Sequence, residues 1–248
     1  MASAPLFKVV IPARYASTRL QGKPLVDILG KPMIQWVYEA ASASAADQVI
    51  IATDDERIEQ AVKAFGGECC MTRSDHDNGT DRIVEVTQLM GWSDDIIIVN
   101  LQGDEPLMPA DNLTQVANNL HASGFEMATL HKSISTEESD NPNQVKLVCD
   151  KNGRALYFSR SQIPFDRDHS GAVYFGHIGL YAYRVGFLKQ YAQMQPCMLE
   201  HSEKLEQLRA LFHGYNIHTE LACKTPGHGV DTAQDLAQVI AVLGAKNQ

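Results

Sequence analysis

The stretch VIIATDDERIEQAVKAFGGECCMT, residues 49–72, decides the fold class. Two short β-rich runs, Val49–Ala52 and Cys69–Thr72, flank a segment whose apolar residues recur at helical spacing. Gly66–Gly67 ends this predicted helix, and one of its faces carries Ile58, Ala61, Val62 and Phe65. Strand, helix and strand in this order are the βαβ unit of a parallel sheet.

The same alternation extends on both sides of this unit. It predicts strands at Val9–Ile11 and Ile96–Leu101, and helices at about Pro32–Ala43 and Thr80–Met90. The almost continuous apolar run of Ile96–Leu101 is typical of a central strand.

Farther along the chain, Asn152–Gly153 between two β-rich runs predicts an antiparallel hairpin. The remaining predicted elements are a strand from His177, helices at about Val185–Gln193 and Glu200–His213, a strand at Ile217–Cys223, and a helix from Ala233 with Thr232 and Asp235 as its capping box. The sequence therefore predicts an α/β fold with one domain over residues 1–248. Its central sheet is expected to be mostly parallel, with a smaller β-rich insertion near residues 130–180.

Composition and charge exclude several classes of protein. The 248 residues are 44% hydrophobic and 21% charged, as in ordinary globular proteins, and the formal net charge is −9. That charge argues against nucleic-acid and membrane partners, because either needs a broad basic face. Residues Met1–Phe7 lack the basic start and apolar stretch of a secretory signal, so we expect a cytoplasmic protein. The five cysteines show no CxxC spacing, which favours free buried thiols over zinc or disulfides.

The loop after the first predicted strand, PARYASTRLQGKP at residues 12–24, is rich in phosphate-binding groups. Ligands of open α/β sheets bind beyond the carboxyl ends of strands, where this loop is expected. Neither a P-loop nor a GxGxxG motif is present, so side chains must supply much of the positive charge. The available groups are those of Arg14, Arg19, Lys23, Ser17, Thr18 and Gly22. The loop predicts a polyphosphate ligand, with a solvated loop of surface ion pairs as the alternative.

Carboxylates follow the predicted central strand at the same edge of the sheet. In DDIIIVNLQGDEP, Asp104 stands just beyond the strand, where a polyphosphate would require an intervening cation. Magnesium is usually held by one or two protein carboxylates together with phosphates and waters. Asp104 is therefore a candidate Mg²⁺ ligand, and Asp231 in GVDTAQD can supply a second carboxylate. A turn-forming role for Asp104 and a helix-capping role for Asp231 are the alternatives.

An ordered set of motifs resembles the 3-deoxy-manno-octulosonate (Kdo) cytidylyltransferase family. The motifs are IPARYASTRLQGKPL, ATDDERI, MTRSDHDNGTDR, VNLQGDEP, ALYFSRSQIPFDRD, HIGLYAYR, LEQLRAL and GVDTAQDL, and they extend from about Val9 to Leu236. The resemblance implies a Rossmann-like nucleotide-diphospho-sugar transferase fold. It implies transfer of CMP from CTP to Kdo, giving CMP-Kdo and pyrophosphate for lipopolysaccharide biosynthesis. It also implies Mg²⁺ as cofactor and a homodimer to which the β-rich insertion contributes.

The resemblance also assigns residues by motif. The CTP-binding set is Arg14, Ser17, Arg19, Lys23, Arg73, Asn78, Gly79 and Thr80, and the catalytic group is Lys23, Arg14 and Asp104. Asp104 and Asp231 would bind Mg²⁺. The sugar-acid set is Gln102, Arg160, His177, Tyr181, Glu206 and Gln207, with Arg160 paired to the carboxylate of the sugar acid.

The sequence departs from the family pattern in three places. Gln21 stands where Pro is common, Asp77–Asn78 replaces a Ser-containing lead, and Gly176 stands where Arg is frequent. Because that cation beside His177 is missing, an 8-amino analogue of Kdo is an alternative acceptor. Sialic acid, a sugar phosphate, and a non-catalytic nucleotide-binding role are further alternatives that the sequence leaves open.

Overall fold

Nine strands form one sheet in the computed structural model, which describes residues 5–16, 20–76 and 78–246. They are β1 (Phe7–Pro12), β4 (Gln48–Thr53), β5 (Cys69–Met71), β6 (Ile97–Asn100), β7 (Met127–Ile134), β8 (Lys146–Cys149), β9 (Ala155–Ser159), β10 (Tyr174–Arg184) and β11 (Ile217–Leu221). The order is β11–β7–β10–β6–β1–β4–β5, with β8 paired to β10 and β9 to β8. A separate small hairpin joins β2 (Asp27–Ile28) to β3 (Lys31–Pro32).

Strand direction determines where the loops meet. β1 pairs in parallel with β4 and β6, β4 with β5, and β7 with β11. On this main path only β10 is reversed, and it runs antiparallel to β6 and β7. The prediction of a mostly parallel sheet with a central β6 is therefore confirmed. The loops after β1, β4, β5 and β6 leave the same edge, and Tyr181 of β10 lies opposite Asn100 at the end of β6.

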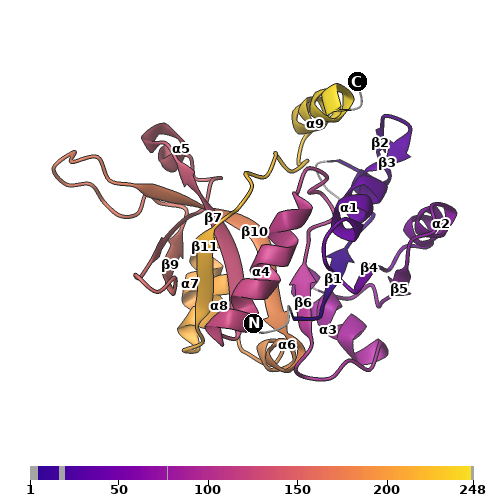
Figure 1. Ribbon diagram of the computed structural model, residues 1–248, viewed down its shortest axis with the longest axis horizontal. Coiled ribbons are helices and arrows are strands. Elements are labelled where there is room, and N and C mark those ends of the chain that lie inside the picture. The colour runs from indigo at the N-terminus through magenta and orange to yellow at the C-terminus, as the bar shows by residue number, and fades with distance from the viewer. Residues whose placement is uncertain (1–4, 17–19, 77, 247–248) are drawn as a thin grey trace.

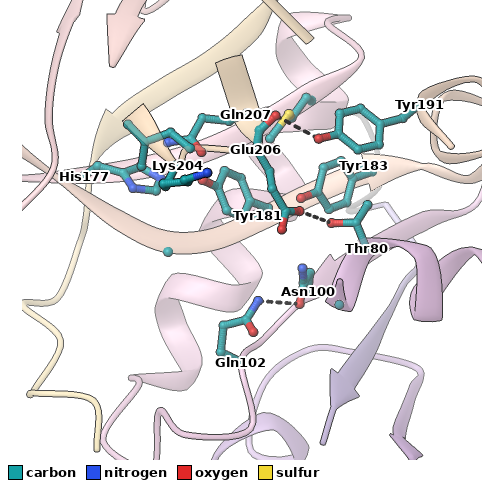
Figure 2. A pocket seen from close by; sticks show the side chains of 14 residues that line it. Thr80, Asn100, Gln102, His177, Tyr181, Tyr183, Tyr191, Lys204, Glu206 and Gln207 are labelled. Atoms are coloured by element: carbon teal, nitrogen blue, oxygen red, sulfur yellow. Dashed lines mark hydrogen bonds between the residues drawn. The ribbon is translucent and has the colours of Figure 1, made fainter. Parts of the chain in front are cut away.

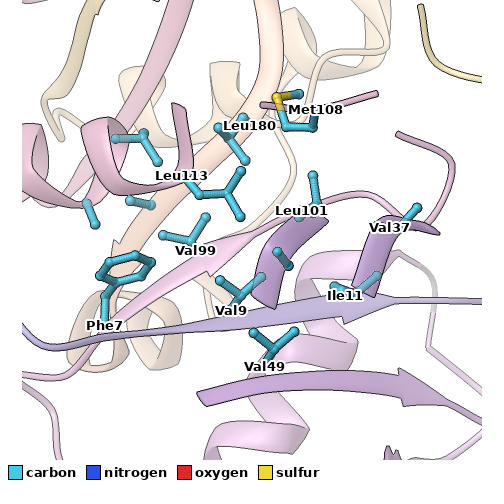
Figure 3. Close-up of a cluster of buried hydrophobic side chains, with 14 of the residues drawn as sticks. Phe7, Val9, Ile11, Val37, Val49, Val99, Leu101, Met108, Leu113 and Leu180 are labelled. Atoms are coloured by element: carbon cyan, nitrogen blue, oxygen red, sulfur yellow. The ribbon is translucent and has the colours of Figure 1, made fainter. Parts of the chain in front are cut away.

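Helices cover both faces of the sheet, because successive side chains of a buried strand point to opposite faces. They are the 3₁₀ turn η1 (Lys23–Leu25), α1 (Met33–Ser42), α2 (Glu56–Ala64), α3 (Gly79–Leu89), α4 (Ala110–Ser123), α5 (Thr136–Asp140), α6 (Val185–Tyr191), α7 (Met198–Glu203), α8 (Gln207–Phe212) and α9 (Ala233–Lys246). Phe7, Val9 and Ile11 of β1 pack with residues of α1 and α4 (Figure 3). The same cluster includes Ile58 and Val62 of α2, whereas Val10 faces α3, α6 and α8. The sheet is therefore the middle layer of three (Figure 1).

The C-terminal helix α9 packs beside the β2–β3 hairpin and α1 (Figure 1). Val239 and Leu243 of α9, and Val230 before it, are buried in a cluster with Ile28. This cluster fixes the segment that contains Asp231 next to the residues that follow the first loop. None of the helices in the described ranges is long and apolar enough to span a membrane.

Two predictions about the chain are corrected. The predicted single helix Glu200–His213 is wrong: α7 and α8 are separate, and Lys204 between them has a left-handed backbone with φ of 54°. All five cysteines are free thiols, as predicted. Their predicted burial is confirmed for Cys70 and Cys197 but is wrong for Cys223, which is exposed.

Candidate functional site

The first loop contacts the residues that precede α3. Arg14, just beyond β1, donates from Nη2 to the carbonyl oxygens of His76 at 2.6 Å and Asn78 at 3.0 Å. Asn78 caps α3, because its side-chain oxygen accepts the backbone N–H of Asp81 at 2.8 Å. Arg14 thus holds the N-terminus of α3, where free N–H groups favour anions, next to the first loop.

Gly79 and Thr80, the first two residues of α3, lie where β1 ends. A Cβ atom on Gly79 would lie 3.4 Å from the Pro12 ring, so the helix starts in close contact with the strand. Thr80 is buried, and its hydroxyl donates to Glu206 Oε2 at 3.3 Å. Ser17 and Arg19, also predicted to bind CTP, lie outside the described residues.

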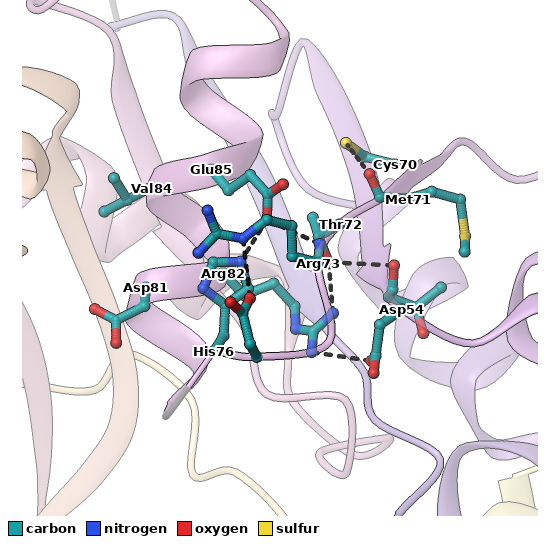
Figure 4. A network of polar contacts seen from close by, with 12 residues as sticks. Asp54, Cys70, Met71, Thr72, Arg73, His76, Asp81, Arg82, Val84 and Glu85 are labelled. Atoms are coloured by element: carbon teal, nitrogen blue, oxygen red, sulfur yellow. Dashed lines mark hydrogen bonds and ion pairs between the residues drawn. The ribbon is translucent and has the colours of Figure 1, made fainter.

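A buried network behind the first turn of α3 fixes this helix end (Figure 4). Arg82 has no exposed surface, forms an ion pair of 2.9 Å with Asp54 after β4, and donates to the hydroxyl of Thr72 after β5. His76 contacts Glu85 of α3. The network ties the ends of β4 and β5 to α3.

Lys23 joins the two aspartates that the sequence places at this edge. Its ammonium group lies 2.6 Å from Asp104 Oδ2 and 3.0 Å from Asp231 Oδ1. Burial lowers the pKa of Lys23, but the charges and hydrogen bonds of both aspartates outweigh burial and raise it. Carboxylates from the end of β6 and from the segment before α9 therefore converge on one point.

Two converging carboxylates fit the ligand set expected for Mg²⁺. They already hold one cation, the Lys23 ammonium group. Among the described residues, no group of three or more His, Cys, Asp or Glu side chains is gathered for a metal ion. Magnesium at Asp104 and Asp231 would therefore take its other ligands from phosphates and water, as it commonly does.

A cavity of about 270 Å³ opens beside β10, the end of β6 and the start of α3 (Figure 2). We call it the first cavity. Its walls are Gly79, Thr80, Asn100, Gln102, Met127, His177, Gly179, Tyr181, Tyr183, Tyr191, Lys204, Leu205, Glu206 and Gln207. The cavity brings together all of the predicted sugar-acid residues except Arg160, and it adds Gly79 and Thr80 of the predicted CTP-binding set.

His177 presents a neutral imidazole to this cavity, because burial and the neighbouring His131 lower its pKa to about 3. Its Nε2 lies 3.1 Å from Thr129 Oγ1. The Thr129 hydroxyl points at the carbonyl oxygens of Ile178 and Leu180, at 3.0 and 2.9 Å, so it accepts from His177. The proton on Nε2 leaves Nδ1 as a hydrogen-bond acceptor.

Glu206 and three tyrosines supply further polar groups. Burial raises the pKa of Glu206, and the Glu206 carbonyl accepts from the Tyr191 hydroxyl at 2.8 Å. Burial also raises the pKa values of Tyr181 and Tyr183 well above 10, so both hydroxyls remain protonated. Donors and acceptors of this kind suit a ligand with many hydroxyl groups.

A second cavity of about 350 Å³ adjoins the first and shares His177 and Gly179 with it. Asp104 and Asp231 line this second cavity together with Glu105. Burial raises the pKa of Glu105 to about 8, and the two aspartates add to the rise. The metal-site candidates and the first cavity are therefore neighbours at one sheet edge.

Arg73 and Arg160 do not line either cavity. The Arg73 side chain is 69% exposed and pairs with Asp75 at 2.9 Å. Arg160 donates from Nε to the Glu203 carbonyl at 2.7 Å and from Nη1 to the Pro142 carbonyl at 3.0 Å. The structure does not bring Arg160 together with the other predicted sugar-acid residues.

The sequence-based predictions omit Asn100, Tyr183 and Thr129. Asn100 precedes Gln102 by two residues and accepts from it at 3.2 Å, whereas Tyr183 follows Tyr181 by two. Side chains two residues apart in an extended chain share a face, so alternation carries the signal for both. Thr129 reaches His177 only through the pairing of β7 with β10.

Comparisons with known proteins agree with this geometry. The model of the cytidylyltransferase family matches residues 8–217. A 3-deoxy-manno-octulosonate cytidylyltransferase of Vibrio vulnificus strain YJ016 is 56% identical over 97% of this chain and 99% of its own length. One from Vibrio cholerae serotype O1 strain M66-2 is 54% identical over 98% and 99%.

Solved structures give the same picture. A CMP:2-keto-3-deoxy-manno-octonic acid synthetase in complex with CTP is 46% identical, with a TM-score of 0.93 over 97% of this chain and 99% of that chain. A cytidylyltransferase from Leptospira borgpetersenii, at 15% identity and a TM-score of 0.64, shares the fold. The fold and the matched family model define a nucleotidyltransferase of the cytidylyltransferase class. The two Vibrio relatives narrow the class further, because they are more than 50% identical to this chain over nearly its full length. The chain therefore belongs to the 3-deoxy-manno-octulosonate cytidylyltransferase family.

Proposed function

We propose that this protein transfers CMP from CTP to Kdo, releasing pyrophosphate and CMP-Kdo for lipopolysaccharide biosynthesis. The observation that carries the proposal is the cluster of Lys23, Asp104 and Asp231 beside a cavity lined largely by polar side chains. The cluster suits a triphosphate with its counter-ion, and the cavity suits a hydroxyl-rich acceptor. Relatives named for this activity, and a related synthetase structure that contains CTP, support it.

The phosphates of CTP would bind between the first loop and α3. The free N–H groups at the start of α3 favour an anion, and Asn78 and Arg14 hold that helix end in place. Lys23 offers a point charge at the same edge. Ser17, Arg19 and Arg73 are assigned to CTP by the resemblance.

Mg²⁺ is part of the proposal, with Asp104 and Asp231 as its protein ligands. When bound, the ion would act as a Lewis acid at the phosphates. Lys23 contacts both carboxylates, so it orients them and places a second positive charge where pyrophosphate would leave. Preorganised charge of this kind costs little reorganisation during the reaction.

The anomeric hydroxyl of Kdo would attack the α-phosphorus of CTP in line with the departing pyrophosphate. The side chains of the first cavity position the acceptor for this attack. Nδ1 of His177 and the carboxyl oxygens of Glu206 accept from sugar hydroxyls, while the Tyr181 hydroxyl and the Gln102 amide donate. No covalent intermediate on the protein is required.

A homodimer and a cytoplasmic location also belong to the proposal. Large apolar side chains are exposed on the β-rich insertion, at Leu156, Phe165 and Val173. Exposed apolar side chains can belong to an interaction surface, and a second copy of this chain is the partner that we assign to them. The cytoplasmic location follows from the use of CTP as substrate.

The test is pyrophosphate release by the purified protein with CTP and Mg²⁺. Kdo, its 8-amino analogue and sialic acid are offered as separate acceptors, and EDTA is the control. We expect EDTA-sensitive release with Kdo. Release with only another acceptor would transfer the assignment to that acceptor, and CTP binding without release from any of them would contradict the proposed function.

A further inference from the structure

We propose that Lys204 binds the carboxylate of the acceptor in the first cavity, with the side-chain amide of Gln207 as its partner. The inference rests on the proposed function, because it takes the acceptor to be a sugar acid. Three independent features of the α7–α8 junction carry it: charge, an unpaired buried donor and backbone conformation.

Lys204 supplies the positive charge that the first cavity otherwise lacks. Among the described residues that line this cavity, it is the only lysine or arginine, and His177 is neutral there. Arg160, expected to pair with the carboxylate, donates to two backbone carbonyls outside the cavity. A carboxylate that leaves water needs charged or multiple hydrogen-bond partners, and Lys204 is the cation available.

The ammonium group of Lys204 is available for a ligand. Within the described part of the chain, it forms no hydrogen bond or ion pair. The two nearest carboxylates in sequence are engaged elsewhere. Glu203 accepts from the Ser159 hydroxyl and the Arg160 backbone N–H, and Glu206 Oε2 accepts from Thr80. Figure 2 shows the Lys204 side chain extending along the wall that His177 and Tyr181 also form.

Gln207 provides a second donor on the same wall. Its side chain lines the first cavity and the residue is 5% exposed, yet Nε2 has no hydrogen-bond partner among the described residues. Buried polar atoms are almost always paired, so this amide calls for an acceptor from a ligand. A carboxylate has two oxygens, and one can accept from Gln207 while the other contacts Lys204.

The backbone at Lys204 is unusual for a lysine. It lies in the left-handed region, with φ of 54° and ψ of 47°, at the C-terminus of α7. Helices that end in this conformation usually have Gly or Asn there, because other residues are strained. The junction is held from both sides, since Arg209 Nε donates to Glu200 Oε2 at 2.8 Å. A lysine at a glycine-like position is a strained feature of the kind that recurs at ligand-binding sites.

Steady-state kinetics of Lys204→Met and Lys204→Arg test the inference. We expect Lys204→Met to raise KM for Kdo about tenfold or more, which is typical for a lost charge-assisted hydrogen bond. KM for CTP should change less than about twofold, and Lys204→Arg should recover most of the loss. Lys63→Met, which removes an exposed lysine on α2, is the matched control and should leave both KM values unchanged.

A neutral acceptor separates binding from a structural role. Replacing the carboxylate of Kdo by a carboxamide should greatly lower kcat/KM in the wild-type protein and much less in Lys204→Met. A lysine that only shapes the junction would affect both acceptors equally. Lys204→Gly should fold with an unchanged or higher Tm, because Gly accepts the left-handed backbone, while showing the same rise in KM for Kdo.

Each outcome decides between this inference and the proposed function. A wild-type protein that does not use Kdo would remove the proposed function and this inference together. An active wild-type protein with unchanged KM for Kdo in Lys204→Met would refute the inference alone. A rise in KM for CTP only would place the ammonium group at the nucleotide. If Lys132→Met, in the second cavity, raises KM for Kdo and Lys204→Met does not, the carboxylate lies in that cavity instead.

Discussion

Replacing Arg82 by Met should lower the free energy of unfolding by about 3 kcal/mol. Arg82 is fully buried, lies 2.9 Å from Asp54 and donates to Thr72. Removing one partner of a buried ion pair typically costs about 3–5 kcal/mol, because the other charge stays buried without compensation. The Asp54 side chain is 24% exposed, so water can solvate part of its charge and we take the low end of that range. For a chain of this size the loss corresponds to a fall in Tm of roughly 6–12 °C.

A double-mutant cycle measures the pairing itself. Urea unfolding followed by circular dichroism gives the free energy for wild type, Arg82→Met, Asp54→Asn and the double variant. We expect the double variant to lose at least about 1 kcal/mol less than the sum of the single losses. Arg167→Met, whose side chain is 88% exposed, is the control and should change stability by less than about 0.5 kcal/mol. Additive losses, or a loss below about 1 kcal/mol for Arg82→Met, would refute this reading of the network.

Three further predictions concern the sheet edge. Lys23→Ala and Asp104→Ala should each lower kcat on the order of a hundredfold or more with Tm nearly unchanged; near-normal turnover would remove that residue from the mechanism. Folding raises the pKa of Glu105 from 4.5 to about 8, so the folded state keeps a proton that the unfolded state releases. Stability of the metal-free protein should therefore fall as pH rises from about 4.5 to 8, and Glu105→Gln should flatten this fall in Tm. Leu243→Ala should cost about 2–3 kcal/mol and weaken Mg²⁺ binding measured by calorimetry, because α9 anchors Asp231; unchanged Mg²⁺ affinity would separate α9 from the site.

The sequence predicts the sheet well where the local pattern and the final environment agree. The βαβ unit at residues 49–72 is one case, since Asp55 caps α2 and Gly66 with φ of 78° follows its end. The predictions leave α4 unassigned although its buried residues repeat at helical spacing, at Leu113, Val116, Ala117 and Leu120. The place of β10 between β6 and β7 follows from long-range pairing, which local patterns do not contain.

The sequence predicted the meeting of those side chains whose positions follow from strand ends. Lys23, Asp104 and Asp231 meet as expected, because parallel strands deliver their carboxyl ends to one edge and α9 packs back on the hairpin. Arg160 shows the limit of this reasoning. Its motif matches the family, but whether its guanidinium faces a cavity depends on contacts with Pro142 and Glu203 that only the folded chain sets.

The break between α7 and α8 shows why local preference fails at a binding site. Residues 200–213 include three Glu and three Leu, which favour one continuous helix, and such a helix would spare Lys204 its left-handed backbone. The chain instead breaks there and holds the break with the Glu200–Arg209 pair and the bond from Tyr191 to the Glu206 carbonyl. Residues 204–207 of the break line the first cavity, so the conformation that local propensity disfavours is the one that delivers side chains to it. The conflict between helix propensity and the observed break therefore points to function here. The Kdo kinetics of Lys204→Gly can establish that, because this one variant would both relieve the backbone strain and lose the binding of Kdo.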